Sequence, residues 1–457
     1  MIVMKFGGSS VESAAAIERV AGIVRERLDR KPVVVVSAMG KTTNRLLSIA
    51  NHALGGRRDV ALRELLDLKQ FHLRESGMER TVDDHFQELA ELVRGLAVLG
   101  ELSPRAIDAI SSFGERLSSL IVANHFEKHG LKAVHLDARK VIITDNRHTQ
   151  AVPNFPETYR RLAAAVPPLA EKRVVVMGGF IGATAEGVTT TLGRGGSDLT
   201  ASIVGAGIGA EEIQIWTDVD GMLTADPRVI PGGHRVRLCS FAEAAELAYF
   251  GAKVLHPSTV LPAVEKNIPV LILNSRRPYV EGTRIISETV HSSNVVKALA
   301  CKQNILLFNI HSTRMLMAHG FLRRIFEIFD RYETPVDMLA TTEVSVSLTV
   351  DETEKLDHIL AELREFAEVS VEKNQSIVSL VGENIRHTPG VAARVFKSLK
   401  DINVRMISQG ASLLNLSFVV AMNDVKPAMQ ALHDEFFSEL DPAVFDVGAF
   451  EDAGVAP

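Results

Sequence analysis

The sequence has little cysteine and few aromatic residues. Its 457 residues include two cysteines, one tryptophan and four tyrosines, and aromatic residues make up 5% of the chain. Cys239 and Cys301 lie far apart without a CxxC motif, and we identify no histidine pair at the spacing of a metal site. We therefore expect neither disulfides nor a protein-bound metal such as zinc, and a reducing cytoplasm fits this composition best.

The sequence also lacks long apolar runs and any excess of basic charge. It carries 50 basic and 56 acidic side chains, with a formal charge of −6 and no basic run. No apolar stretch approaches the roughly 18 residues of a membrane span, and the start, MIVMKFGG, is unlike a signal peptide. Nucleic acid and membrane are therefore not expected as partners.

The apolar fraction of 46% is ordinary for globular proteins, and the length suggests about three domains. Short apolar runs alternate with helical segments through most of the first 275 residues, which is typical of an α/β layer fold. The patterns predict buried parallel strands at 33–37, 174–178, 213–217 and 269–274, and helices at 11–28, 116–129, 197–204 and 241–250. We interpret the charged helical segment 57–99 as an insertion or a lid.

After about Ser275 the chain becomes polar, and then it repeats itself. The segment GFLRRIFEIFDRYETPVDML begins at Gly320, and the similar GVAARVFKSLKDINVRMISQ begins at Gly390. Each copy predicts an amphipathic helix and a strand, with second strands at 344–350 and 414–420, which indicates two ferredoxin-like α+β modules. We place the domains at 1–285, 286–375 and 376–457, and the strand near 295–300 is a candidate for sharing between the modules.

Two glycine-rich motifs have the pattern of ligand-binding sites. KFGGSSV places Lys5 after a strand, before two glycines and a helix start, so backbone N–H groups and a cation could hold a phosphate; a tight surface turn is the alternative. TLGRGGSDLTA sets Arg194 among glycines, free to clamp a carboxylate, with Asp198 at a helix start where it could also be a simple cap.

Two further motifs are weaker on their own. WTDVDGMLTADPR follows a predicted strand with Asp218, Asp220, Asp226 and Arg228, and is as typical of a plain turn as of a nucleotide-contacting loop. In FGERLSS, Glu115 alone would be an ordinary acid in the first turn of a helix.

Taken in order, KFGGSSV, SAMGKTTN, FGERLSS, TLGRGGSD, WTDVDGMLTADPR and FGAKVLHP resemble the aspartate kinases of the amino-acid kinase superfamily. The repeated modules resemble tandem ACT domains, and the monofunctional, lysine-sensitive type is the most similar. The resemblance implies a parallel-rich sheet between helices followed by two ACT domains. It also implies transfer of the γ-phosphoryl group of Mg-ATP to the β-carboxylate of L-aspartate, the first step toward lysine, threonine and methionine.

The resemblance also implies roles for individual residues. Lys5 and Asp198 are the expected catalytic residues, stabilising the phosphoryl group and organising the site. Aspartate is expected to bind Thr43, Glu115, Arg194, Ser37, Gly196 and Ser197, with Glu115 on its ammonium and Arg194 on its α-carboxylate. ATP is expected to contact Lys5, Gly7, Gly8, Thr217, Asp218, Arg228 and Lys253. Leu223 departs from the family, where a tyrosine is common.

The ACT domains imply feedback inhibition by an amino acid, with lysine expected, and a homodimer or homotetramer. The effector is expected near Met315, Ala318, Gly320, Phe321, Leu322, Val336 and Asp337. Asp337 could meet an ammonium group or be a solvated turn residue. Two alternatives remain at this stage: a kinase for another small acid such as glutamate, a carbamate or a nucleotide, and a non-catalytic amino-acid sensor.

Overall fold

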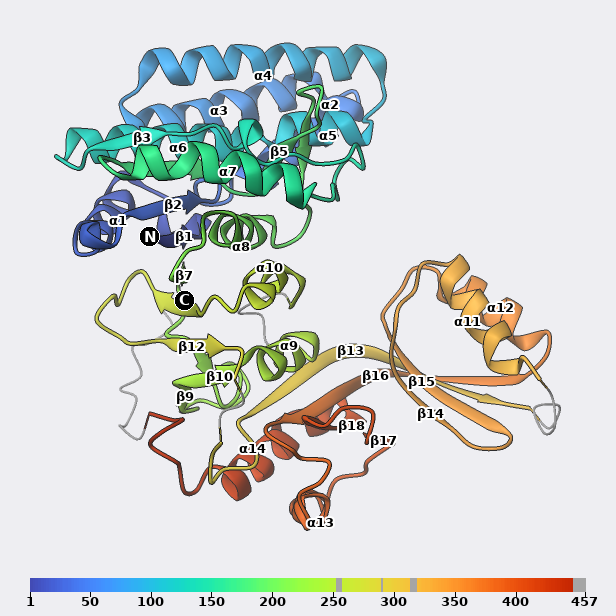
Figure 1. Ribbon diagram of the computed structural model, residues 1–457. Helices are drawn as coiled ribbons and strands as arrows, with labels where there is room; N and C mark the ends of the chain where they lie inside the picture. Colours follow the sequence, from blue (N-terminus) through green and yellow to red (C-terminus); the bar gives the residue numbers. More distant parts are fainter. Residues whose placement is uncertain (252–256, 289–290, 313–318, 447–457) are drawn as a thin grey trace. The chain divides into compact units, whose positions relative to one another are not determined.

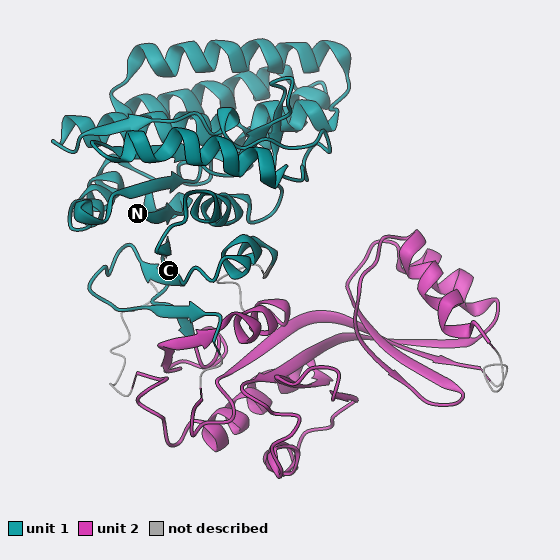
Figure 2. Cartoon of the chain, in the orientation of Figure 1, with its two compact units in different colours: residues 1–222, 254–288 teal, residues 223–253, 289–457 magenta. Residues whose placement is uncertain are grey.

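The computed structural model describes residues 1–251, 257–288, 291–312 and 319–446. These residues form two compact units, which are coloured separately in Figure 2. Unit 1 comprises residues 1–222 and 254–288, and unit 2 comprises residues 223–253 and 289–457. The chain passes from unit 1 to unit 2 within the short strand β8 (Met222–Leu223). No helix within the described ranges is long and apolar enough to cross a membrane.

Unit 1 is a layered α/β structure (Figure 1). Its strands are β1 (Ile2–Phe6), β2 (Pro32–Val36), β3 (Ala133–His135), β4 (Val174–Gly178), β5 (Ile181–Ala183), β6 (Thr189–Thr191), β7 (Glu212–Thr217), β11 (Val270–Asn274) and β12 (Thr283–Ile286). Its α-helices are α1 (Ala14–Arg25), α2 (Thr42–Leu54), α3 (Arg58–Ser76), α4 (Glu79–Leu99), α5 (Pro104–Ser111), α6 (Phe113–Lys128), α7 (Phe155–Ala170), α8 (Gly196–Ile208) and α10 (Leu261–Glu265).

The main sheet of unit 1 has the strand order β12-β11-β7-β1-β2-β4-β3. All neighbours from β11 to β3 are parallel, and β12 is antiparallel to β11. β1, β2 and β4 are buried along their whole length, which explains their continuous apolar sequences. Because the central strands are parallel, the loops after β1, β2, β4 and β7 lie at one edge of the sheet, where ligands of such folds bind.

The two faces of the sheet are covered by different helices. Ile2, Met4 and Phe6 of β1 share one hydrophobic core with buried residues of α1, α2, α3, α4 and α6. Side chains alternate along a strand, so Val3 and Lys5 point to the other face, where α8 packs on β1.

The segment 57–99 forms α3 and α4, and it is not a detached insertion or lid. Leu65 and Leu68 of α3 and Phe86 and Leu89 of α4 are buried in the same core as the main sheet. The apolar stripe on each helix is buried because it packs against the helices next to the sheet.

Unit 2 contains the two repeated modules. Its strands are β9 (Arg235–Val236), β10 (Leu238–Ser240), β13 (Ala298–His311), β14 (Val336–Thr341), β15 (Ser345–Asp351), β16 (Glu368–Val381), β17 (Met406–Gln409) and β18 (Asn415–Ala421). Its α-helices are α9 (Phe241–Tyr249), α11 (Phe321–Arg331), α12 (Leu356–Arg364), α13 (Val391–Ser398) and α14 (Val425–Phe436).

The modules share one six-stranded sheet with the order β14-β15-β13-β16-β18-β17. The strands β13 and β16 are each 14 residues long and pair antiparallel along their length (Figure 1). The second half of β13 pairs with β15, whereas the second half of β16 pairs with β18. Each long strand therefore supplies one half to each module, and the ladder changes register near Asn304, which has a positive φ of 61°.

Candidate active site

Lys5 lies at the end of β1, on the face of the sheet that α8 covers. The loop that follows it passes very close to the loop after β2. A Cβ atom on Gly8 would lie 2.8 Å from the carbonyl oxygen of Gly40 and 2.9 Å from that of Ala38, so only glycine fits. The Gly40 N–H donates to the Gly8 carbonyl at 3.0 Å. The glycines of KFGGSSV therefore bring two loops together beside the lysine.

Asp198 stands in the first turn of α8, opposite Lys5. Gly193 and Gly195 precede the helix with φ values of 75° and 71°, a conformation that side chains other than glycine disfavour. The Lys5 Nζ lies 2.7 Å from the Asp198 Oδ1, at ion-pair distance although without the angles of a hydrogen bond. Asp198 is therefore more than a helix cap, because its carboxylate holds the Lys5 ammonium group beside the glycine loops.

Glu115 is buried in the first turn of α6, with 4% of its surface exposed. Its Oε1 accepts a hydrogen bond from the Ala38 N–H at 3.1 Å, and its Oε2 has no hydrogen-bond partner in the described part of the chain. Burial raises the pKa of Glu115 to about 8, although the bond from Ala38 opposes the shift. A buried carboxylate with a free oxygen is a receptor for a cationic group.

Arg194 is exposed on the loop before α8, and no hydrogen bond or ion pair of its guanidinium is found within the described ranges. A guanidinium that is not already paired can take a carboxylate in bidentate fashion. Its position among glycines therefore leaves it available to a ligand, as the sequence predicts.

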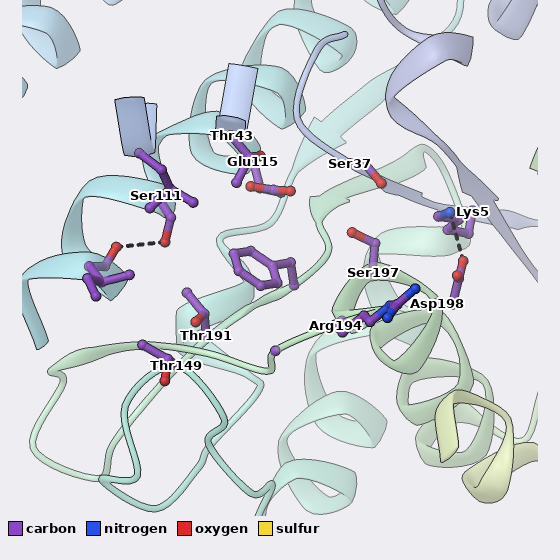
Figure 3. A pocket seen from close by; sticks show the side chains of 16 residues that line it. Lys5, Ser37, Thr43, Ser111, Glu115, Thr149, Thr191, Arg194, Ser197 and Asp198 are labelled. Carbon is purple, nitrogen blue, oxygen red and sulfur yellow. Dashed lines mark hydrogen bonds and ion pairs between the residues drawn. The ribbon is translucent and has the colours of Figure 1, made fainter. Parts of the chain in front are cut away.

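These side chains line one open cavity of about 490 Å³ (Figure 3). Glu115, Arg194, Lys5 and Asp198 converge on it from α6, the loop before α8, β1 and α8. The cavity is therefore lined at different points by an acid, a free arginine and a lysine–aspartate pair. The lining residues are Lys5, Ser37, Thr43, Leu47, Ile107, Ser111, Glu115, Thr149, Phe180, Thr191, Gly193, Arg194, Gly195, Gly196, Ser197 and Asp198.

One wall of the cavity depends on Asp108, which the sequence did not single out. Asp108 is fully buried on α5, and its carboxylate accepts hydrogen bonds from the Thr149 N–H at 3.0 Å and the Thr191 hydroxyl at 2.5 Å. The His148 Nδ1 lies 2.7 Å from its Oδ2. Thr149 has a φ of 71°, so this carboxylate holds a strained loop residue against the cavity.

Several residues expected to contact the nucleotide do not line this cavity. Thr217 ends β7 next to Gly7, whose N–H donates to the Trp216 carbonyl at 3.1 Å, and Asp218 follows it, exposed. Neither lines the cavity of Figure 3. Arg228 belongs to unit 2, where it forms an ion pair with Asp226. Lys253 lies outside the described residues.

Comparisons with known proteins agree on one family. Residues 1–274 match the amino acid kinase family, and residues 378–436 match an ACT domain. The chain is 40% identical over 464 residues to the chloroplastic aspartokinase 2 of Arabidopsis thaliana, covering 96% of this chain and 85% of that protein. It is 36% identical over 447 residues to the lysine-sensitive aspartokinase 3 of Escherichia coli, covering 96% and 99%. The chain belongs to the aspartokinase family.

Solved structures agree with this assignment. The E. coli aspartokinase III complex with aspartate and ADP, described as the R-state, matches with a TM-score of 0.83 at 35% identity, covering 96% of this chain and 100% of that one. The T-state complex with lysine and aspartate matches with a TM-score of 0.80 at 36% identity, covering 96% and 99%. The expected fold, an amino-acid kinase domain with ACT domains, and the expected aspartate kinase activity are confirmed.

The residues expected at the regulatory site of this aspartokinase family member are only partly described. Met315 and Ala318 lie outside the described residues. Gly320 precedes α11, and Phe321 and Leu322 begin it. Phe321 packs against the same hydrophobic core as Val336, which begins β14.

Asp337 is not a solvated turn residue. It lies in β14, and 6% of its side chain is exposed. The Lys302 Nζ donates to its Oδ1 at 2.8 Å and also lies 2.9 Å from the Asp351 Oδ1. Burial raises the pKa of Asp337, and Lys302 opposes that shift. This carboxylate already holds one ammonium group.

The expectation that no histidine pair stands at the spacing of a metal site is wrong. His125 and His129 are four residues apart at the end of α6, and together with Glu18 they offer three ligand atoms within 4.8 Å of one another. Residues four positions apart lie on the same face of a helix, so this histidine pair could have been found from the sequence. Glu18 is 107 residues away from His125, so its contribution could not have been found from the local sequence.

Proposed function

We propose that the cavity of unit 1 binds L-aspartate and positions its β-carboxylate to attack the γ-phosphorus of Mg-ATP. A carboxylate oxygen forms the new P–O bond, the bond to ADP breaks, and the product is 4-phospho-L-aspartate. The observation that supports this most directly is the free Oε2 of Glu115 in the same cavity as the free guanidinium of Arg194. Those two groups match the ammonium and the α-carboxylate of an amino acid.

The aspartate site would use side chains from four segments of the cavity wall. Glu115 would hold the ammonium and Arg194 the α-carboxylate, which leaves the β-carboxylate of the substrate free to react. A substrate that lacks the ammonium would leave the buried Glu115 unpaired, which costs about 1–3 kcal/mol or more. The remaining contacts would come from Ser37, Thr43, Gly196 and Ser197.

Catalysis would rest on position and charge, because a carboxylate is already nucleophilic and needs no strong base. Lys5 would stabilise the negative charge on the transferring phosphoryl group, and Asp198 would hold the Lys5 ammonium in place. The glycine backbone of the loop after β1 would let phosphate oxygens approach. The contacts of unit 1 to the nucleotide would come from Lys5, Gly7, Gly8, Thr217 and Asp218.

Magnesium fits the donor set only as part of the nucleotide complex. Mg²⁺ usually binds substrate phosphates together with one or two protein carboxylates. The cavity offers Asp198, paired with Lys5, and Glu115, whose raised pKa keeps it largely protonated at pH 7. Asp198 would therefore supply the protein ligand, and the ion would neutralise phosphate charge.

We further propose that lysine inhibits the enzyme through unit 2. The E. coli relative is lysine-sensitive, and its T-state structure holds lysine and aspartate. Asp337 pairs with the ammonium of Lys302, so an effector ammonium would compete with that lysine for the carboxylate. Residues Met315, Ala318, Gly320, Phe321, Leu322 and Val336 would complete the site. Binding would stabilise an arrangement of the modules in which the catalytic loops do not close.

The division into a kinase domain at 1–285 and regulatory modules at 286–375 and 376–457 is part of the same proposal, with the strands β13 and β16 shared between the two modules. So is a homodimer or homotetramer formed through the modules. The outer strands of their sheet are β14 and β17, and Leu339 and Ile407 on them are exposed apolar side chains. Exposed apolar side chains of this kind favour burial against a second copy.

The test is to trap the acyl phosphate with hydroxylamine in the presence of Mg-ATP. Hydroxamate should form with L-aspartate, form far less with L-glutamate, and decrease when lysine is added. The variant Lys5→Met should form little product, while Lys31→Met, which removes an exposed lysine paired with Glu171, should match the wild type. No hydroxamate from folded wild-type protein would contradict the proposed reaction, and hydroxamate unaffected by lysine would contradict the proposed effector.

A further inference from the structure

Two histidines and a glutamate gather on the surface of unit 1, away from the cavity. His125 and His129 lie one turn apart at the C-terminal end of α6, and their rings stack with centroids 4.0 Å apart. Glu18 reaches them from α1, the neighbouring helix. The site is accessible to solvent, because 15% of the His125 side chain, 42% of His129 and 47% of Glu18 are exposed.

The three side chains converge on one point. The Glu18 Oε2 lies 3.0 Å from the His125 Nε2 and 3.3 Å from the His129 Nε2. Two ligands that each lie about 2.1 Å from one ion are about 3.0 to 3.4 Å apart when they subtend about 90 to 109°. The two separations from Glu18 therefore have the spacing of neighbouring ligands on a single metal ion, and all three ligand atoms lie within 4.8 Å of one another.

The backbone contact of His129 turns its Nε2 toward the centre of the cluster. Its Nδ1 lies 2.9 Å from the His125 carbonyl oxygen, which can only accept, so Nδ1 carries the proton. With Nδ1 engaged by that carbonyl, Nε2 is the ring atom that faces the Glu18 carboxylate, at 3.3 Å, and it is the atom a metal ion would bind. A backbone carbonyl that fixes the tautomer in this way is typical of metal-binding histidines.

The charges around the cluster are of both signs. Arg25 donates to the His129 carbonyl at 3.2 Å, and Lys128 stands beside the rings on α6. Against these, Glu18 carries a full negative charge, and the C-terminal end of a helix favours cations. Both histidines lie in the last turn or at the C-cap of α6.

We propose that Glu18, His125 and His129 bind one divalent late transition-metal ion of the zinc type. Two imidazoles and one carboxylate suit zinc, cobalt, nickel or copper, whereas magnesium prefers oxygen ligands alone. Water would fill the remaining positions, since the site is open. The ion would join α1, which follows the glycine loop at Lys5, to α6, which begins beside Glu115. Its role is to stabilise the two helices that carry the cavity, and it takes no part in phosphoryl transfer.

The experiment uses the untagged full-length chain, freed of metal by chelation, with no nucleotide present. Addition of Co²⁺ should produce visible d–d absorption that saturates at one equivalent. Zn²⁺ should displace the bound Co²⁺, abolish this absorption and raise the melting temperature of the protein. Millimolar Mg²⁺ should do neither. The variants His129→Gln and Glu18→Gln should each weaken Co²⁺ binding at least tenfold.

The matched control is His387→Gln, which removes an exposed histidine of unit 2 and should leave binding unchanged. Because Glu18 and His129 are exposed, their variants should retain the melting temperature of the metal-free wild type. Equal Co²⁺ affinity in the wild type and both ligand variants would overturn the proposal. So would the absence of binding at millimolar Co²⁺, which would leave His125 and Glu18 as an ordinary proton-sharing pair.

Discussion

Aspartate binding should release a proton from Glu115. Burial raises the pKa of this carboxyl from 4.5 to about 8, so at pH 7 only about one molecule in ten has it ionised. An ammonium group beside its free Oε2 favours the ionised form, so binding at pH 7 should release about 0.9 proton. The apparent affinity is reduced by the unionised fraction, and it should therefore rise about tenfold from pH 6 to pH 7 and level off above pH 8.

The assay is calorimetric titration with L-aspartate at pH 6, 7 and 8.5, in buffers of different ionisation enthalpy. The variant Glu115→Gln cannot titrate, so its binding should release no proton from this position. At pH 8.5 it should bind aspartate about 10 to 150 times more weakly, because a hydrogen bond to a charged group contributes about 1.5–3 kcal/mol. Wild-type binding without proton release, or the same pH dependence in Glu115→Gln, would refute the reasoning.

The same shift predicts a change in stability. Since the pKa of folded Glu115 is above its unfolded value, its contribution to the free energy of unfolding is fully present below about pH 4.5 and is lost as the pH rises through about 8. The shift corresponds to about 5 kcal/mol at most. Without substrate, Glu115→Gln should therefore gain stability relative to the wild type at pH 8 and not at pH 4, as measured by denaturant unfolding.

Lys5→Met should lower turnover about 10²–10³-fold with an unchanged circular dichroism spectrum, and turnover within threefold of the wild type would remove Lys5 from the mechanism. Arg194→Ala should raise the KM for aspartate about 10- to 150-fold, whereas Arg147→Ala, on an exposed loop, should not; steady-state kinetics separate them. Asp108→Asn should lower the free energy of unfolding by about 1–3 kcal/mol, because an amide cannot accept all the hydrogen bonds that the Asp108 carboxylate accepts. Equal midpoints of denaturant unfolding in the variant and the wild type would contradict this. Asp337→Asn should raise the lysine concentration for half-inhibition at least tenfold without changing turnover in its absence, and an unchanged dose response would exclude Asp337 from the effector site.

The strands and helices were largely predictable because each is set by a local pattern. The continuous apolar run 174–178 forms β4 with the same bounds, and the helix expected at 197–204 lies within α8. The helix expected at 11–28 is shorter, since it starts at Ala14, after Ser13 accepts a hydrogen bond from the Ala16 N–H. Ser13 is a capping residue that the sequence contains, so this boundary could have been found.

The candidate site was only partly predictable. Lys5, Arg194 and Asp198 stand in glycine-rich motifs, whose chemistry can be read from neighbouring residues. Glu115 was ordinary in sequence because burial, which gives it its raised pKa, depends on the loop at Ala38. Asp108 had no local signal at all, since its partners Thr149 and Thr191 are 41 and 83 positions away.

The two 14-residue strands of unit 2 also limit how its modules can be exchanged. Because β13 and β16 each run through both modules, no single cut in the chain releases one of them intact. A chimaera that transplants only one repeat would break the hydrogen-bond ladder in the middle. The smallest segment that can be transferred to another protein with its sheet intact is therefore the one from β13 to α14. Within it the two modules should melt as one body, however different their ligands.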